Sequence, residues 1–437
     1  MRRIRRAVSV LPAVLLCAAV SRAEPDLLSP AERDIVSRLE TREPQMLAEL
    51  ESWVAMNSGS ANQAGLQAMA NQLEQDLGAL GFETRQQQLD PVEFPGLEPR
   101  PAGPIVIGSL GPDPAPVRFL LVGHYDTVFE PDHPFSASKG LGERDGRLRG
   151  PGVADMKGGL LVMFEVLRAL RASGDLARAR WTVLLNGDEE TGSLGSRDWI
   201  EREARRADYG VGFEAAREAG GRGGSRRGGG QCSLSVRGVA AHAGSAHRRG
   251  HSAILELARK VVMIEALTDY SRGVTLNVGV IAGGTKRNVV PDRASAWIDL
   301  RYDKPEEGQR IRAEIERIAA LQPDPATRSE LWGRLHRPPK LASPQVHELL
   351  ARHRSAAEAL GLDWPDPHHA GGGTDGSLMG AVGLPTLDSM GVIGSNAHTD
   401  GETAIRSSLT ERAALASLLL RRLIESPALP ARSGKVD

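Results

Sequence analysis

Apolar residues along the chain follow two patterns. Near the N-terminus they recur at steps of three and four residues, at Leu66, Met69, Leu73, Leu77 and Leu80, which is typical of one face of an amphipathic helix. Farther on, short apolar runs alternate with helical patterns, at residues 117–122, 160–170, 181–185 and 211–213. This alternation predicts an α/β domain in which helices flank a mixed, largely parallel sheet.

The pattern changes near Gln231 and keeps its new form to about Lys340. Here we expect an α+β unit of ordinary domain size, with strands at 232–236, 274–281 and 294–302 and helices at 252–267 and 305–321. Helices near 345–360 and 409–424 would then complete the first domain. We therefore predict one domain from residues 24–230 and 341–437, with residues 231–340 inserted as a second domain.

Composition and charge narrow the class of protein. Hydrophobic residues make up 41% and charged residues 25% of the 437 residues, which excludes a disordered or multi-span membrane protein. The 54 basic side chains balance the 55 acidic ones, so no overall field attracts nucleic acid. Segment 220–230 reads GGRGGSRRGGG without aromatic residues, so we interpret it as a flexible connector rather than an RNA-binding element.

Residues 1–23 have the pattern of a secretory signal peptide. Arginines within residues 2–6 precede a mainly apolar stretch at 7–20, and Ser21 and Ala23 offer the small residues of a cleavage site. A buried N-terminal helix would not need those arginines, and the stretch is short for a membrane span. We expect a secreted or periplasmic protein with no stable membrane anchor, in which Cys232 is the remaining cysteine.

Histidine and acidic residues gather where the predicted strands end. These positions carry His124, Asp126, Asp155, Glu189, Glu190 and Glu214. Because ligand sites of open α/β sheets lie at the carboxyl ends of the strands, we expect these side chains to converge in one crevice. Clustered carboxylates in a poorly solvated crevice are unfavourable unless a cation neutralises them. Histidine together with carboxylates suits zinc or a related divalent ion.

Each of these residues alone also has an ordinary structural interpretation. His124 and Asp126 could be a surface pair, and Asp155 could be a helix N-cap. Paired glutamates are common in the first turn of a helix. His398 could be a loop histidine. The order of the clusters at successive strand ends favours a metal site over these alternatives.

Several motifs together resemble a known family. They are GHYDTV, GPGVADMKGG, NGDEETGS, Glu214, GVAAHAG, GGTKRNVVPD, GGGTDG and SNAHTDGE, which span residues 123–402. The chain resembles the co-catalytic zinc exopeptidases and amidohydrolases, which include glutamate carboxypeptidase, acetylornithine deacetylase and succinyl-diaminopimelate desuccinylase. The spacing and the leader resemble most the glutamate carboxypeptidase branch. The resemblance implies a two-domain fold with an inserted lid and dimerisation domain.

The resemblance also implies roles at the metal site. Two zinc ions per chain are expected, with Co²⁺ as another possible metal. His124 and Glu214 resemble ligands of the first ion, Glu190 and His398 resemble ligands of the second, and Asp155 resembles the bridge. Asp126 resembles the carboxylate that orients His124. Glu189 resembles the general base that takes a proton from the attacking water.

Other residues resemble family positions that meet the substrate. His242 resembles a histidine that reaches the site of a neighbouring subunit, which implies a homodimer. Asn288 and Arg301 resemble binders of the terminal carboxylate of the substrate. Further substrate-binding candidates are Arg222, Arg337, Gly373 and Thr374, and an interdomain salt bridge is an equal alternative for Arg337.

These roles imply hydrolysis of the amide bond to a C-terminal amino acid in a small peptide or N-acyl amino acid. Because several arginines accompany the carboxylate binders, we expect glutamate-type or folate-like substrates. One alternative is an N-acyl amino acid deacylase or dipeptidase on the same scaffold. Another is a binding protein on an inactive scaffold, and the intact metal positions and Glu189 count against it.

Overall fold

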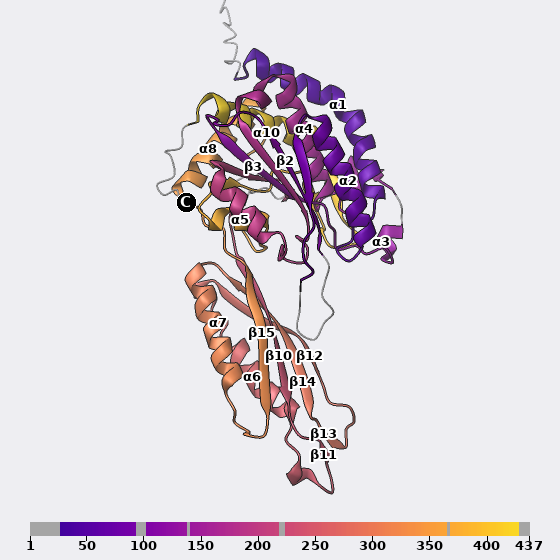
Figure 1. Cartoon of the computed structure of the whole chain (residues 1–437), viewed down its shortest axis with the longest axis vertical. Coiled ribbons are helices and arrows are strands. Elements are labelled where there is room, and N and C mark those ends of the chain that lie inside the picture. The colour runs from indigo at the N-terminus through magenta and orange to yellow at the C-terminus, as the bar shows by residue number, and fades with distance from the viewer. Residues whose placement is uncertain (1–26, 93–101, 138–139, 218–222, 365–367, 428–437) are drawn as a thin grey trace, which may run out of the picture.

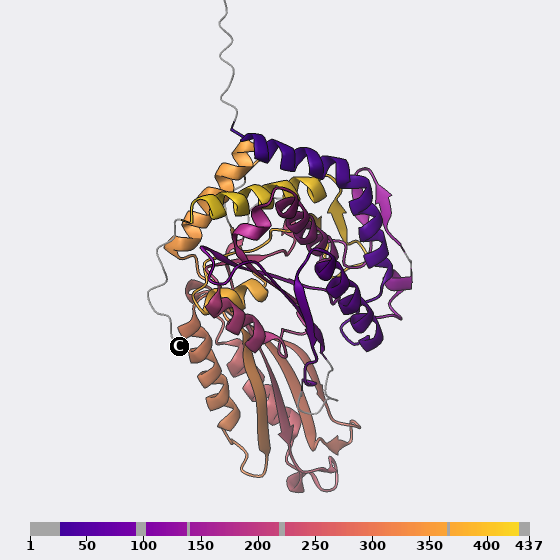
Figure 2. The same ribbon diagram turned by 45° about the horizontal axis from the view of Figure 1, so that its top comes forward.

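The computed structural model describes residues 27–92, 102–137, 140–217, 223–364 and 368–427. They form a larger α/β domain and a smaller α+β domain that projects from it, as predicted (Figures 1 and 2). The predicted leader at 1–23 and the candidate Arg222 lie outside the described residues. No helix within the described ranges is both long and apolar enough to cross a membrane.

A six-stranded sheet of order β1-β2-β6-β3-β7-β17 forms the centre of the larger domain. β3 lies between β6 and β7 and is parallel to both, whereas β2 is antiparallel to β1 and β6. The sheet is therefore mixed, with parallel strands at its centre, as the sequence predicts. The strands are β1 (Glu83–Gln87), β2 (Gly103–Leu110), β3 (Arg118–His124), β6 (Arg180–Gly187), β7 (Tyr209–Gly212) and β17 (Thr386–Leu387).

Helices cover both faces of this sheet, which explains why its strands read as continuous apolar runs. One face, which includes Leu121 and Val183, packs against α2 and α4, and α1 and α10 lie against α4. The other face, which includes Leu120 and Leu184, packs against α5 and α9. The helices are α1 (Pro30–Ala55), α2 (Gln63–Ala79), α4 (Lys157–Ala172), α5 (Arg197–Arg206), α8 (Pro344–Ala359), α9 (Asp375–Ala381) and α10 (Ser408–Glu425).

The smaller domain is an antiparallel sheet of order β12-β14-β10-β15, with α6 (Ala253–Glu265) and α7 (Pro305–Ala320) on one face. A short pair of strands, β11 (Ala241–His242) and β13 (Val289–Val290), lies at the end of this domain that is remote from the larger domain (Figure 1). The four sheet strands are β10 (Gly228–Arg237), β12 (Val274–Gly283), β14 (Arg293–Tyr302) and β15 (Arg328–Arg337).

The glycine- and arginine-rich segment is not a flexible connector over its described residues. β9 (Gly223–Arg226) pairs with β16 (His368–Ala370), and β10 begins at Gly228, so the expected boundary at 230/231 falls inside a strand. Ion pairs hold the segment in place. Nε of Arg226 lies 2.8 Å from a carboxylate oxygen of Asp388, and Nε of Arg227 donates to Asp303 at 2.8 Å.

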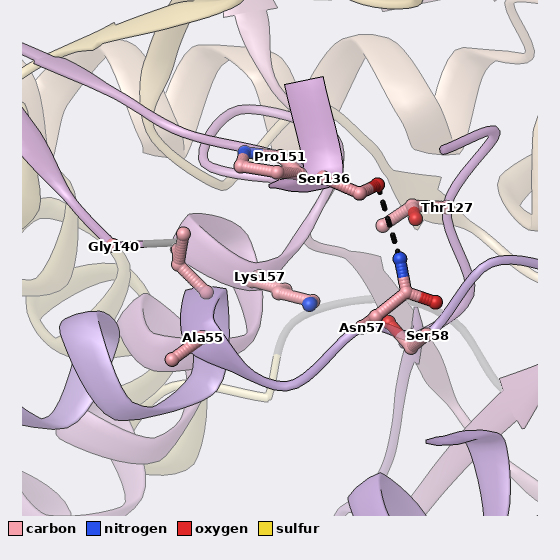
Figure 3. Close-up of a pocket in the computed structure, with 9 residues that line it drawn as sticks. Ala55, Asn57, Ser58, Thr127, Ser136, Gly140, Pro151 and Lys157 are labelled. Atoms are coloured by element: carbon pink, nitrogen blue, oxygen red, sulfur yellow. Dashed lines mark hydrogen bonds between the residues drawn. The ribbon is translucent and has the colours of Figure 1, made fainter. Parts of the chain in front are cut away.

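A buried lysine joins the start of α4 to the end of α1 (Figure 3). Lys157 Nζ donates hydrogen bonds to the carbonyl oxygens of Trp53 at 3.0 Å and Met56 at 2.6 Å. The last carbonyl groups of a helix lack partners within the helix, so a lysine near this end satisfies them. This contact fixes α1 beside the loop that carries Asp155.

Lys157→Met should lower the free energy of unfolding by roughly 1–3 kcal/mol, because the carbonyl oxygens of Trp53 and Met56 would each lose the hydrogen bond from Lys157. Thermal and urea unfolding would measure the change. The exposed control Lys304→Met should stay within about 0.5 kcal/mol of wild type. Equal stability of both variants would show that Lys157 does not tie α1 to α4.

Candidate metal centre

The central parallel strands end at one edge of the sheet, and the predicted acidic and histidine side chains follow them. His124 is the last residue of β3, Glu189 and Glu190 follow β6, and Glu214 follows β7. Asp155 lies one residue before the N-cap of α4, and no side chain caps that helix. The N-cap interpretation of Asp155 therefore does not hold, and its carboxylate is available to the site.

Asp155 lies between two histidines from distant parts of the chain. Its Oδ1 is 3.1 Å from Nε2 of His124, and its Oδ2 is 3.2 Å from Nε2 of His398. Each histidine also faces a glutamate: Nε2 of His124 is 3.8 Å from Oε1 of Glu214, and Nε2 of His398 is 3.1 Å from Oε2 of Glu190. The structure thus brings the five candidate ligands together, in two sets that share Asp155.

A second sheet, of order β4-β5-β19-β18-β8, places Glu214 and His398. Glu214 lies two residues before β8, His398 lies between β18 and β19, and β8 pairs in parallel with β18. His398 has φ +65°, a conformation that is uncommon for residues other than glycine and that surrounding contacts must hold. The strands are β4 (Gly142–Arg144), β5 (Arg147–Arg149), β8 (Ala216–Arg217), β18 (Ile393–Ser395) and β19 (Thr403–Ile405).

Asp126 connects His124 to the turn that carries the paired glutamates. Its carboxylate accepts hydrogen bonds from the backbone N–H groups of Glu189 at 3.2 Å and Glu190 at 3.1 Å. Its Oδ1 also lies 3.3 Å from Nδ1 of His124, although the backbone oxygen of Asp126 is nearer, at 3.0 Å. Asp126 therefore fixes two ligand-bearing segments without being a ligand itself.

Glu402 is a buried residue of the site that the sequence analysis does not single out. Its carboxylate accepts hydrogen bonds from the backbone N–H groups of Gly152 at 3.1 Å, Ala154 at 2.8 Å and Asp155 at 2.9 Å. Burial raises the pKa of Glu402 to about 7, although these hydrogen bonds act in the opposite direction. Its place at the end of the SNAHTDGE motif was the available signal in the sequence.

The pKa values of the central carboxylates show how unfavourable the charge density is. Burial, with added repulsion from Asp155, raises the pKa of Glu190 to about 7, and burial also raises the pKa of Glu214. Burial acts on Asp155 in the same sense, but hydrogen bonds with the two histidines outweigh it and hold its pKa below the usual range. Hydrogen bonds to Asp155 and Glu190 raise the pKa of His398 to about 11.

The site fits divalent cations. Ligand atoms of His124, Asp155 and Glu190 all lie within 4.8 Å of one another. Oε1 of Glu190 is buried and has no hydrogen-bond partner among the described residues, so it has an unused lone pair. Histidine nitrogen with carboxylate oxygen is a donor set that suits Zn²⁺ and related ions. With Asp155 shared, the two ligand sets offer places for two cations.

Glu189 lies outside both ligand sets. Its Oε1 accepts a hydrogen bond from Nη2 of Arg337 at 2.6 Å, and burial raises the pKa of Glu189 well above its usual value although Arg337 opposes the shift. Nη1 of Arg337 donates to Asp375 at 2.7 Å, so Arg337 makes the interdomain salt bridge that the sequence left open. A carboxylate with a raised pKa beside a metal site can accept and return a proton.

His242, Asn288 and Arg301 do not form one pocket within a single chain. His242 is on β11 and Asn288 directly precedes β13, at the remote end of the smaller domain (Figure 1). Arg301 is at the opposite end of the ten-residue strand β14, where it donates to Asp299 at 2.9 and 2.8 Å. Because a strand rises about 3.3 Å per residue, Asn288 and Arg301 are separated by roughly 25 Å or more. Asn288 and Arg301 of one chain therefore cannot bind the same substrate carboxylate, and their contact with substrate remains a prediction.

Gly373 and Thr374 contact protein groups in this structure. A Cβ atom at Gly373 would lie 2.9 Å from Cβ of Arg337, which explains why the position holds a glycine. The hydroxyl group of Thr374 donates a hydrogen bond to the buried carboxylate of Asp388. Their contact with substrate remains a prediction.

Comparisons with known proteins agree with this geometry. The sequence profile of peptidase family M20/M25/M40 matches residues 120–422. Carboxypeptidase G2 of Pseudomonas sp. (strain RS-16) is 29% identical over 390 residues, which cover 87% of this chain and 90% of that protein. Acetylornithine deacetylase of Myxococcus xanthus is 31% identical over 209 residues, which cover 45% of this chain and 53% of that protein.

Solved structures show the same fold. Aminopeptidase PepT from Bacillus cereus has a TM-score of 0.69 at 23% identity and covers 87% of this chain and 98% of its own. Human carnosine dipeptidase 1 has a TM-score of 0.68 at 17% identity and covers 91% of this chain and 99% of its own. Because the family match spans more than half of the sequence, the chain belongs to peptidase family M20/M25/M40 and is a metallopeptidase-type hydrolase of peptide bonds.

Proposed function

We propose that the protein is a secreted, zinc-dependent carboxypeptidase that hydrolyses the amide bond to a C-terminal amino acid and prefers glutamate-type residues. The observation that carries this proposal is the position of Glu189 beside two ligand sets that share Asp155. The similarity to carboxypeptidase G2, which extends over most of both chains, supports the carboxypeptidase class. The leader pattern at residues 1–23 supports secretion to the periplasm or beyond.

The catalytic roles follow from the placement of the side chains. His124 and Glu214 would hold one zinc ion, Glu190 and His398 the other, and Asp155 both. When bound, the zinc pair supplies an activated water and polarises the scissile carbonyl group. Glu189 accepts the proton of the attacking water and returns it to the leaving amine.

Arginines near the junction of the two domains favour an acidic substrate. Burial, followed by the charges of surrounding arginines, lowers the pKa of His336 to about 3; these arginines are Arg337, Arg301, Arg334 and Arg197. Such a cluster creates a positive field that attracts carboxylates. Arg301 is the candidate for the terminal carboxylate of the substrate, because its guanidinium is partly exposed while Nε and Nη2 hold it in place through Asp299.

The exposed surface of the smaller domain supports a homodimer. β12 is an edge strand of the sheet, and Val280 and Ile281 on it are 55% and 59% exposed. On the adjacent α6, the exposed apolar residues are Ile254, Leu255, Val262 and Met263. A paired subunit would cover this apolar surface and satisfy the strand edge. It would also give His242 and Asn288, which lie far from their own metal site, a route to the site of the partner.

The substrate proposal predicts the order of kcat/KM on N-acyl amino acids that end in Glu, Leu or Ala. The Glu substrate should exceed the others by about tenfold or more, and Arg301→Ala should lower its kcat/KM by roughly 30-fold, about 2 kcal/mol. Arg312→Ala, on the exposed side of α7, is the matched control and should leave kcat/KM unchanged.

Equal kcat/KM for the three substrates would contradict the acidic preference. Turnover that depends on the acyl group alone would instead indicate an N-acyl amino acid deacylase, and turnover restricted to dipeptides would indicate a dipeptidase.

The homodimer proposal predicts complementation between two inactive variants. Mixed Glu189→Gln and His242→Ala subunits should recover up to about a quarter of wild-type activity, because half of the dimers are mixed and each has one intact site. Unmixed samples of either variant are the controls. A wild-type monomer that is fully active at the assay concentration would refute a shared site.

A further inference from the structure

Arg337 belongs to the smaller domain by its backbone and to the catalytic site by its side chain. It is the last residue of β15 and lies opposite Gly229 of β10. Its carbonyl oxygen accepts a hydrogen bond from the hydroxyl group of Tyr302 at 2.8 Å. The sheet of the smaller domain therefore holds the backbone, while the guanidinium extends into the larger domain and is 3% exposed.

The guanidinium makes three hydrogen bonds that are directed at Glu189 and at one other carboxylate. Nη2 donates to Oε1 of Glu189 at 2.6 Å and to its backbone oxygen at 3.2 Å. Nη1 donates to Oδ1 of Asp375 at 2.7 Å. Because both the side chain and the main chain of Glu189 are held, the planar guanidinium restricts the direction in which this carboxylate points.

Asp375 is itself fixed by the segment that carries Glu189. Its carboxylate accepts hydrogen bonds from Nδ2 of Asn186 at 3.0 Å and from the hydroxyl group of Ser193. Asn186 is in β6 just before Glu189, Ser193 is in the turn that follows, and the side chains of Asn186, Ser193 and Asp375 are all buried. Asp375 therefore connects the end of β6 to Arg337, and Arg337 in turn contacts Glu189 in the turn after β6.

The two chain segments that join the domains are also fixed. Arg226 and Lys340 exchange backbone hydrogen bonds at 3.0 Å, which pairs the entering segment with the leaving one. Arg226 is anchored in the larger domain through Asp388, and Arg227 is anchored in the smaller domain through Asp303. The relative position of the two domains therefore determines where the guanidinium of Arg337 lies with respect to Glu189.

We propose that Arg337, held by Asp375, is a positioning residue that orients Glu189 and makes this orientation depend on the junction between the domains. The proposal rests on the proposed function, in which Glu189 is the general base. A guanidinium that already contacts two carboxylates gains little from a third, so its main effect is on Glu189 rather than on the affinity for substrate. Misplacing a catalytic group by about 1 Å can lower turnover roughly 100-fold.

A double-mutant cycle on an N-acyl glutamate substrate tests this proposal. Arg337→Met should lower kcat by roughly 10- to 100-fold and leave KM within about threefold, with the metal content of wild type. In the Glu189→Gln background the same substitution should have almost no further effect on kcat, because no base remains to be oriented. Asp375→Asn should lower kcat less than Arg337→Met and should be non-additive with it.

Arg168→Met is the matched control, since Arg168 is a largely buried arginine that contacts Glu49 on α1 and Glu165 on α4, away from the junction between the domains. It should keep kcat within about twofold of wild type. If Arg337→Met does not fold, Arg337→Lys replaces it in the cycle and should also be non-additive with Glu189→Gln, because a lysine cannot make the forked contact.

Two outcomes would overturn the positioning role. One is a kcat loss that multiplies with that of Glu189→Gln, and the other is a rise in KM with unchanged kcat, which would identify Arg337 as a substrate binder. Near-normal kcat in Glu189→Gln itself is a different result, because it would refute the general base and hence the proposed function.

Discussion

Several carboxylates lie together in one poorly solvated crevice, and their charge must be neutralised for the larger domain to hold them there. Asp155 remains ionised because histidines from β3 and from the turn after β18 face its two oxygens, whereas burial raises the pKa of Glu190 and Glu214. The elements of the larger domain place the ligand-bearing segments so that these charges oppose one another. Parallel strands bring the ligand segments to one edge, and Asp126 and Glu402 hold those segments through backbone N–H groups. Bound cations would complete the neutralisation.

Local patterns in the sequence were enough to predict the main elements and the side chains that the structure gathers at the strand ends. The alternation of apolar runs and helical patterns predicts the strands around β3 and the helix α4, and the side chains at the strand ends indicate the site. Residues whose role depends on distant partners could not be predicted in this way. Arg226 and Arg227 look like part of a flexible segment until Asp388 and Asp303 are placed beside them. The roles of Glu402 and Asp375 likewise become clear when the groups that donate hydrogen bonds to their carboxylates are known.

The junction between the domains holds residues proposed for substrate recognition and for positioning the general base. The smaller domain carries Arg301 close to His336 and Arg337 beside Glu189, while its far end carries His242. The inserted domain would thus orient Glu189 of its own chain through Arg337. It would also bring His242, at its far end, to the site of a partner subunit. Asn288 and Arg301, which are close in the sequence, accordingly lie at opposite ends of the smaller domain.

Asp155 would be shared by two bound cations, and elemental analysis of the metal content of the purified protein distinguishes this arrangement from a site with one ion. Wild type and the exposed control Asp363→Ala should each retain about two divalent ions per chain after dialysis, as a two-metal site requires. Asp155→Ala should retain fewer than about one, because both ligand sets lose their common member. Retention of about two ions by Asp155→Ala, or full wild-type activity after exhaustive chelation, would contradict the account.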